Sequence, residues 1–168
     1  MTAQAILGRH GRTVLLDFAL VAGIYLMPSL SHLLAQPIYL LEPMRIAVLI
    51  ALLFSHRANA WLVAITLPLA SFWMSGHPEP VKAVLMGIEF SVLIAAYFAL
   101  RRAVRLPAVV SIAAAIVVGK FVYYGSKAMV LSIGWLSGAL VSTPWTLQLT
   151  TAAGTAIVFG LIEAARKK

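Results

Sequence analysis

Long apolar segments separated by short polar connections make up most of this chain, and their lengths predict membrane-spanning helices. A helix needs about 20 mostly apolar residues to cross the hydrocarbon core of a bilayer. We therefore predict an all-α polytopic membrane protein, a six-helix transmembrane bundle in which residues 1–168 form a single integral membrane domain. The spans are expected at about residues 13–34, 43–54, 59–74, 80–100, 107–124 and 144–165.

Two apolar segments are too short for a simple crossing. Residues 43–54 make only about 18 Å of helix, whereas the hydrocarbon core is about 30 Å thick. This span must therefore extend over residues 38–41 as well, or part of it must lie inside the protein. Residues 128–141 are apolar but few, and they include two glycines. Their length favours a re-entrant or interfacial cap over a full span.

The composition agrees with a membrane protein and excludes several function classes. The chain is 62% hydrophobic and 11% charged, with a mean hydropathy of +0.97. Six spans leave no room for a soluble catalytic domain, and no GxxxxGK[ST] phosphate loop is present. We expect neither an enzyme nor a bound cofactor. The absence of cysteine excludes disulfides and thiolate metal sites.

The basic residues indicate an orientation rather than nucleic-acid binding. The net charge of +8 comes from short loops and tails beside apolar spans, and cytoplasmic loops of membrane proteins are enriched in lysine and arginine. Six spans with both termini cytoplasmic place most of the basic residues inside. The inner set is Arg9, Arg12, Arg57, Arg101, Arg102, Arg105, Arg166, Lys167 and Lys168, and the outer set is Arg45, Lys82, Lys120 and Lys127.

Residues 75–90, SGHPEPVKAVLMGIEF, concentrate charge, proline and histidine in a chain that is otherwise mostly hydrocarbon. Glu79, Lys82 and Glu89 are spaced by three and seven residues, which places them near one helix face. Glu89 lies about 13 Å along the helix, near the bilayer midplane. An acid at that depth is a functional-site candidate, although an ion pair with Lys120 of another span would also explain it.

The outer side of the predicted bundle gathers further polar and aromatic groups. Glu42 and Arg45 can pair on one helix face or contact a ligand, and Asp17 fits a structural role at a helix start. A pocket open to the outside follows, with acids and amides at its floor and aromatic rings as stacking surfaces. The predicted substrate-binding residues are Glu89, Lys82, Glu79, His77, Lys120, Gln148 and Trp145.

The length, the six spans and the elaborated outer loops resemble the substrate-binding S component of energy-coupling factor (ECF) vitamin transporters. The run LPLASFWMSGHPEPVKAVLMGIEF is similar to the third-to-fourth helix region of that family, and Ala19 and Gly23 form a small-residue pair in the first helix. The resemblance implies capture of a vitamin or related micronutrient near Glu89 and Lys120. It also implies a T component, which would contact Ala19 and Gly23, and two ATPase subunits.

Two other classes compete with this interpretation. The segment EPMRIAVLIALLFSHRANAW resembles the second and third helices of MreD, a membrane scaffold of the cell-shape machinery. An intramembrane metalloenzyme would need ligands such as His56, His77 and Glu79, but the two histidines are predicted on opposite membrane faces. No HExxH motif is present, so we predict no metal site.

Overall fold

The computed structural model describes residues 11, 14–26 and 41–166, and the elements within these ranges are helical, without strands. A first helix covers Val14–Leu26. The others are α2 (Pro43–Phe54), α3 (Arg57–Ser75), α4 (Pro80–Ala99), the short π-helix η2 (Leu100–Val104), α5 (Ala108–Ser132) and α6 (Trp145–Arg166).

Three prolines and one glycine mark four of the helix boundaries. Pro43 and Pro80 occupy the first turns of α2 and α4, where the missing N–H of proline costs no hydrogen bond. Pro107 precedes α5 in an extended conformation. Gly76 ends α3 with a φ of 69°, a left-handed conformation that glycine adopts without steric cost.

Four of these helices, α3, α4 extended by η2, α5 and α6, are long and apolar enough to cross a membrane. The second helix has the predicted bounds and is as short as expected. The first is described only as far as Leu26, and the remainder of its predicted span, with Pro28 and His32, lies outside the described residues. The all-helical class is confirmed, while the count of six spans remains a prediction.

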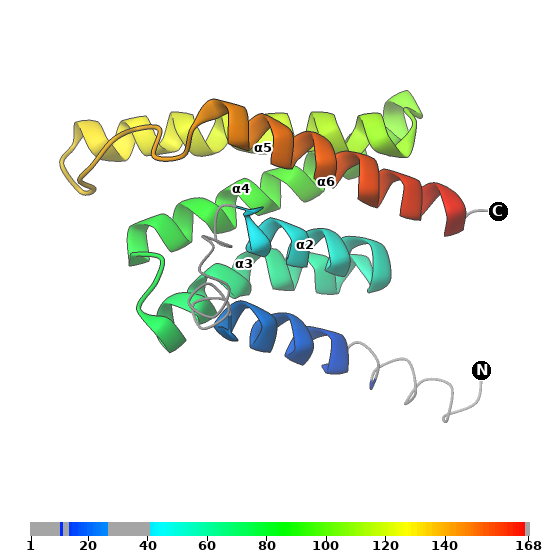
Figure 1. The fold of residues 1–168 in the computed structure, drawn as a ribbon, viewed down its shortest axis with the longest axis horizontal. Coiled ribbons are helices and arrows are strands. Elements are labelled where there is room, and N and C mark those ends of the chain that lie inside the picture. Colours follow the sequence, from blue (N-terminus) through cyan, green and yellow to red (C-terminus); the bar gives the residue numbers. More distant parts are fainter. Residues whose placement is uncertain (1–10, 12–13, 27–40, 167–168) are drawn as a thin grey trace.

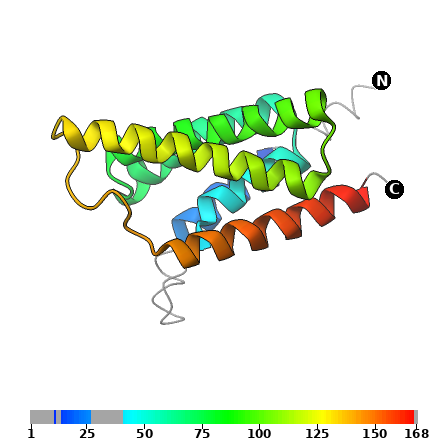
Figure 2. The same cartoon turned by 90° about the horizontal axis from the view of Figure 1, so that it is seen from above.

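The segment 128–141 does not form a helix of its own, and its predicted place as a re-entrant or interfacial cap stays a prediction. Residues 128–132 continue α5, and an irregular connection follows from residue 133 to residue 144. Gly134 has a φ of 75° just after the helix, so the chain turns there rather than at the polar residues near Lys127. Figure 2 shows this connection leaving one end of α5 and returning to the start of α6.

The helices alternate in direction, and α4 lies at the centre of the bundle. It packs against α5 on one side and α3 on the other, while α6 packs against α5. The short helix α2 packs mainly on α3 and also touches α4 and α6 (Figure 1). This crossing brings the start of α2 beside the polar positions of α4 and α5.

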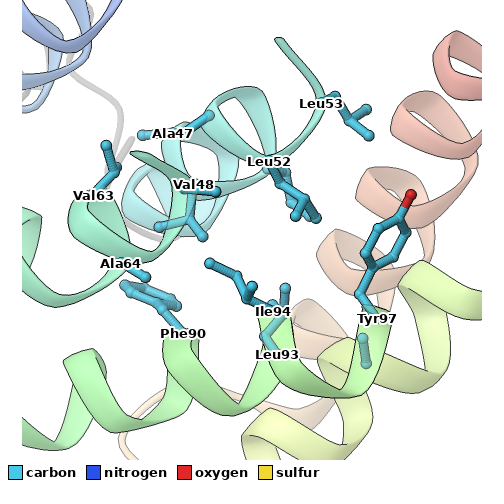
Figure 3. Packing of buried hydrophobic residues seen from close by; sticks show 14 of the residues in the cluster. Ala47, Val48, Leu52, Leu53, Val63, Ala64, Phe90, Leu93, Ile94 and Tyr97 are labelled. Carbon is cyan, nitrogen blue, oxygen red and sulfur yellow. The ribbon is translucent and has the colours of Figure 1, made fainter. Parts of the chain in front are cut away.

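A continuous apolar core fills the space between α2, α3 and α4. Val48 of α2, Ala64 of α3 and Ile94 of α4 are fully buried, and Phe90 packs with them (Figure 3). Large apolar side chains also cover the outside: Trp73 and Phe121 are more than four-fifths exposed. Helices that are apolar both inward and outward are typical of proteins surrounded by lipid, which supports a membrane protein.

Three contacts join the helix ends at which the arginines gather. Arg101 of η2 binds Glu163 of α6 at 2.8 Å, Arg166 donates to the carbonyl of Leu53, and Arg57 lies over the ring of Phe98. We call this region, defined by Arg57, Arg101 and Arg166, the arginine end. The connections 76–79 and 133–144 lie at the opposite end of the bundle, which we call the loop end (Figure 1).

Candidate functional site

Four charged side chains from three helices meet in the half of the bundle toward the loop end. Lys120 Nζ of α5 lies 2.8 Å from Glu42 Oε1 and 3.2 Å from Glu89 Oε1 of α4. Arg45 of α2 contacts Glu42 and lies 3.5 Å from Glu89 Oε1. We call Glu42, Arg45, Glu89 and Lys120 the ionic cluster. Each base contacts both acids, so the four formal charges sum to zero.

The cluster is withdrawn from solvent to different degrees. Arg45 and Glu89 are 2% and 3% exposed, whereas Glu42 and Lys120 are 21% and 23% exposed. Burying ionised groups is costly unless they are paired. The mutual pairing therefore explains how charge is accommodated in an apolar bundle, and the partial exposure of Glu42 and Lys120 leaves one side of the cluster accessible.

A glycine allows α4 and α5 to approach at the cluster. A Cβ atom at Gly119 would lie 3.0 Å from the carbonyl oxygen of Glu89 and 3.5 Å from its Cγ. The 3.0 Å contact with the backbone oxygen is tighter than ordinary van der Waals packing, so a larger residue would push the two helices apart. Gly119 immediately precedes Lys120, and the close approach thus helps to place the lysine ammonium beside the Glu89 carboxylate.

The ionic cluster borders a cavity of about 190 Å³ near the start of α2. All four cluster residues line it, together with His77 and apolar groups that include Met86 and Phe90. The backbone of His77 is held in place because its carbonyl accepts hydrogen bonds from Ser71 and Ser75 of α3, at 2.8 and 3.1 Å.

A larger cavity of about 480 Å³ lies between α5 and α6. It is open on the outside of the bundle, where the lining residues Phe121, Leu149 and Trp145 are 82%, 65% and 57% exposed. Arg45 and Lys120 line it as well, whereas Glu42 and Glu89 do not belong to its described lining. Its other walls are mostly apolar and aromatic: Ile116, Val117, Phe121, Tyr124, Gly125, Trp145, Gln148, Leu149 and Ala152. The volume falls within the range of about 300 to 1,000 Å³ that is common for small-molecule sites.

Hydrogen bonds fix the rim of the larger cavity. Tyr124 Oη donates to Gln148 Oε1 at 2.6 Å, and Gln148 Nε2 donates to the carbonyl of Thr143 at 2.7 Å. Tyr124 also contacts the ring of Trp145, with centroids 5.4 Å apart. The buried Lys127 holds the connection by donating to the carbonyls of two loop residues at 2.9 and 2.8 Å. Tyr124 of α5 thus contacts two residues of α6.

The structure brings together five of the seven predicted substrate-binding residues and leaves two apart. Glu89, His77 and Lys120 line the smaller cavity, and Lys120 lines the larger one with Gln148 and Trp145. The predicted pairing of Glu89 with Lys120 is confirmed at 3.2 Å.

Glu79 and Lys82 lie elsewhere, although their spacing places them near the face of Glu89. They form an ion pair with each other at 3.2 Å, and their side chains are 55% and 31% exposed. Neither residue is part of the described lining of the two cavities. Glu79 precedes the first residue of α4, so this pair remains at the exposed helix start. Glu89 lies about two turns beyond Lys82 along the helix.

Sequence reasoning placed neither Glu42 nor Arg45 among the substrate-binding residues. Their mutual ion pair was predicted and is confirmed, but their contacts with Lys120 and Glu89 depend on how α2 crosses α4 and α5. One signal was available: a charged pair at the start of a helix too short to cross a membrane alone indicates a buried polar environment.

A second polar network lies at the arginine end and serves the packing of helices. Tyr97 Oη of α4 donates to Glu163 Oε2 of α6 at 2.5 Å, and Arg101 binds the other carboxylate oxygen. Asp17 accepts a hydrogen bond from Asn59 of α3 at 2.8 Å. Asn59 lies inside α3, which begins at Arg57.

The small-residue pair of the first helix leaves free space around it. Ala19 is exposed, Gly23 is partly exposed, and a Cβ atom added at Gly23 would meet nothing within 4 Å. Another helix can approach such a face closely.

Within the described ranges, no three histidine or acidic side chains come close enough to hold a metal ion. His56 precedes the first residue of α3, and His77 follows its end. A helix of 19 residues separates them by about 28 Å. Comparison of the chain with protein-family models, with curated proteins and with solved structures found no match.

Proposed function

We propose that this protein is a membrane-embedded substrate-binding subunit that captures a small organic nutrient. One observation carries the proposal: the two bases of the ionic cluster line both cavities, so that the charged groups at the smaller cavity adjoin the aromatic and aliphatic wall of the larger one. Small-molecule sites commonly join an apolar wall with a few convergent polar groups. A charged group buried among membrane helices is by default a candidate for a substrate pathway.

We propose further that the loop end faces the outside and that both termini are cytoplasmic. The contacts of Arg57, Arg101 and Arg166 at the arginine end support this orientation, because basic residues accumulate on the cytoplasmic side. In this orientation both cavities lie toward the outer side.

Single cysteines can test the orientation, since the natural chain has none. Ser137→Cys in the loop-end connection and Arg102→Cys at the arginine end both replace exposed residues. We expect a membrane-impermeant maleimide to label Ser137→Cys in intact cells and to label Arg102→Cys only after permeabilisation. The reverse pattern would refute the orientation.

The resemblance to S components of ECF transporters supports a role in uptake, in which a T component and two ATPase subunits supply the driving force. The open face at Ala19 and Gly23 supports a contact with the T component. Copurification with ATPase subunits from native membranes supports a transport role. Copurification with cell-wall synthesis proteins instead would favour the MreD-like scaffold.

Ligand capture is tested by thermal unfolding of the purified chain against a panel of vitamins and other small nutrients. At least one compound should raise the unfolding midpoint, because a ligand that binds only the folded state stabilises it. Trp145→Ala removes an aromatic wall of the larger cavity and should weaken binding of that compound by about tenfold.

Trp135→Ala is the matched control, since Trp135 is 74% exposed and outside the described cavity linings. It should leave the affinity unchanged. If no compound shifts the midpoint, or if both tryptophan variants bind equally well, ligand capture at this cavity is wrong.

A further inference from the structure

The two carboxylates of the ionic cluster differ in how firmly the fold holds them. Glu89 lies within α4 and is 3% exposed. Glu42 precedes the first residue of α2, is 21% exposed, and has a φ of 53°. Most residues with a side chain avoid this left-handed conformation. Glu42 is therefore the member of the cluster that can leave with the least disturbance of the helices.

Glu42 nevertheless binds both bases of the cluster. Its Oε1 lies 2.8 Å from Lys120 Nζ, and its Oε2 contacts an Arg45 nitrogen. The contact with Arg45 is an ion pair, and Glu42 Oε2 has no hydrogen-bond partner among the described residues. Glu42 thus provides a carboxylate to both bases, and one of its two oxygens forms no hydrogen bond within the described residues.

The bases retain capacity for a further acceptor. Arg45 is 2% exposed, and its Nε has no hydrogen-bond partner within the described part of the chain. A buried donor without a partner is costly and infrequent. On the side of the larger cavity, Arg45 and Lys120 are lining residues and the two acids are not. The surface of this cavity is almost entirely apolar, so Arg45 and Lys120 border it with the stems of their side chains, and a group that enters from it reaches the charged ends beyond the apolar wall.

We propose that the ligand is a small organic carboxylate with an apolar body, and that its carboxylate replaces Glu42 on Arg45 and Lys120. The inference rests on the proposed function and names the ligand class for the same site. The exchange conserves charge: once Glu42 turns toward solvent, two bases face Glu89 and the ligand carboxylate. A guanidinium and an ammonium together match a carboxylate well, and Arg45 Nε gains an acceptor.

The remainder of the ligand occupies the wall between α5 and α6. Phe121, Tyr124 and Trp145 supply aromatic surface beside Leu149 and Ile116. Such a wall favours an aromatic ring or a short alkyl chain and offers little to a multiply hydroxylated molecule. The hydrogen bond between Tyr124 and Gln148 fixes the wall close to the bases.

The test compares acids with their neutral amides on the full-length protein in detergent. The probes are 4-phenylbutyrate, 1-naphthylacetate and octanoate, each paired with its amide, and binding is measured by calorimetry. Glu42→Gln removes the internal competitor, so the acids that bind should do so about tenfold more tightly than to the natural protein. The amides, which do not compete for the bases, should be unaffected. Glu79→Gln, which removes an exposed carboxylate outside the cluster, should change neither.

Glu42→Asn is a second variant, because asparagine tolerates the left-handed conformation and also lacks the charge. It should reproduce the effect if Glu42→Gln folds poorly. An unchanged or weakened affinity of the acids in the folded variants would overturn the exchange, and so would acids and amides that bind equally.

Failure of this inference can be distinguished from failure of the proposed function. If the nutrient panel yields a neutral or cationic ligand whose binding depends on Trp145, capture stands and the carboxylate assignment falls. If the acids do not bind and the larger cavity holds a phospholipid in the purified protein, the carboxylate assignment also falls. If no compound of any charge binds, both proposals fall.

Discussion

Replacing Arg45 by methionine is expected to lower the thermal unfolding midpoint of the purified protein by about 10 °C. The substitution retains a long side chain but leaves Glu42 and Glu89 sharing Lys120. Glu89 is 3% exposed, so the excess negative charge remains in an apolar environment. Removing one partner of a buried ion pair costs about 3 to 5 kcal/mol, and each kcal/mol shifts the midpoint of a chain of this size by about 2 to 4 °C.

Two further variants identify the cause of this loss. Arg102→Met removes an arginine that is exposed at the arginine end, and it should shift the midpoint by less than about 2 °C. Arg45→Met combined with Glu89→Gln removes the excess charge and should recover part of the lost stability. The loss of stability in the double variant is compared with the sum of the losses in Arg45→Met and Glu89→Gln. If the double variant loses more than that sum, Arg45 stabilises the bundle by packing rather than by balancing charge.

Gly160→Ala is expected to be the most destabilising single-methyl addition among the glycines that the structure describes. The new Cβ would lie 2.5 to 2.7 Å from Cγ2, Cα and N of Val109. Two of these atoms are backbone, so a rotamer change cannot relieve the contact and α6 must move away from α5. Overpacking of this kind costs about 1 to 3 kcal/mol, or about 2 to 12 °C in the unfolding midpoint.

Gly154→Ala provides a control in the same helix, because a Cβ atom there meets nothing within 4 Å. Alanine has the higher helix propensity by about 1 kcal/mol, so this variant should be neutral or slightly more stable. In the same unfolding assay, Gly160→Ala should therefore lower the midpoint, whereas Gly154→Ala should leave it unchanged or raise it. Equal midpoints for both variants would contradict the close packing of α5 against α6.

The helices were predictable because proline and glycine mark their ends independently of tertiary contacts. The bounds 43–54 for α2 and the start of α4 at Pro80 follow from this local chemistry. The end of α5 was not predictable in the same way. Apolar residues run through Lys127 into the connection, and the lysine is buried by loop carbonyls that only the folded chain brings to it.

The candidate site was predictable only in part, for a related reason. A lone acid deep in α4 needs a base, and Lys120 in a neighbouring span was the natural partner. The contacts of Arg45 with Glu89 and of Glu42 with Lys120 join residues far apart in the chain. Helical spacing placed Glu79 and Lys82 near the face of Glu89. Spacing does not indicate how deeply a residue is buried in the bundle, and this pair remains near solvent.

The charge balance of the ionic cluster connects the stability of the bundle with the proposed function. Two bases hold two acids, one rigidly within α4 and one at the exposed start of α2. A cluster that served packing alone would gain little from two adjoining cavities and from a buried Arg45 Nε that has no hydrogen-bond partner in the described part of the chain. The same four residues therefore stabilise the helices and provide the polar part of the proposed ligand site.

Native mass spectrometry of the protein, extracted gently from the membrane in which it is made, tests ligand capture most directly. The account predicts a population heavier than the 18.1 kDa chain by the mass of one small organic molecule. Trp145→Ala should reduce this population, and Trp135→Ala should retain it. A spectrum that contains only the bare chain and its phospholipid adducts would contradict the account.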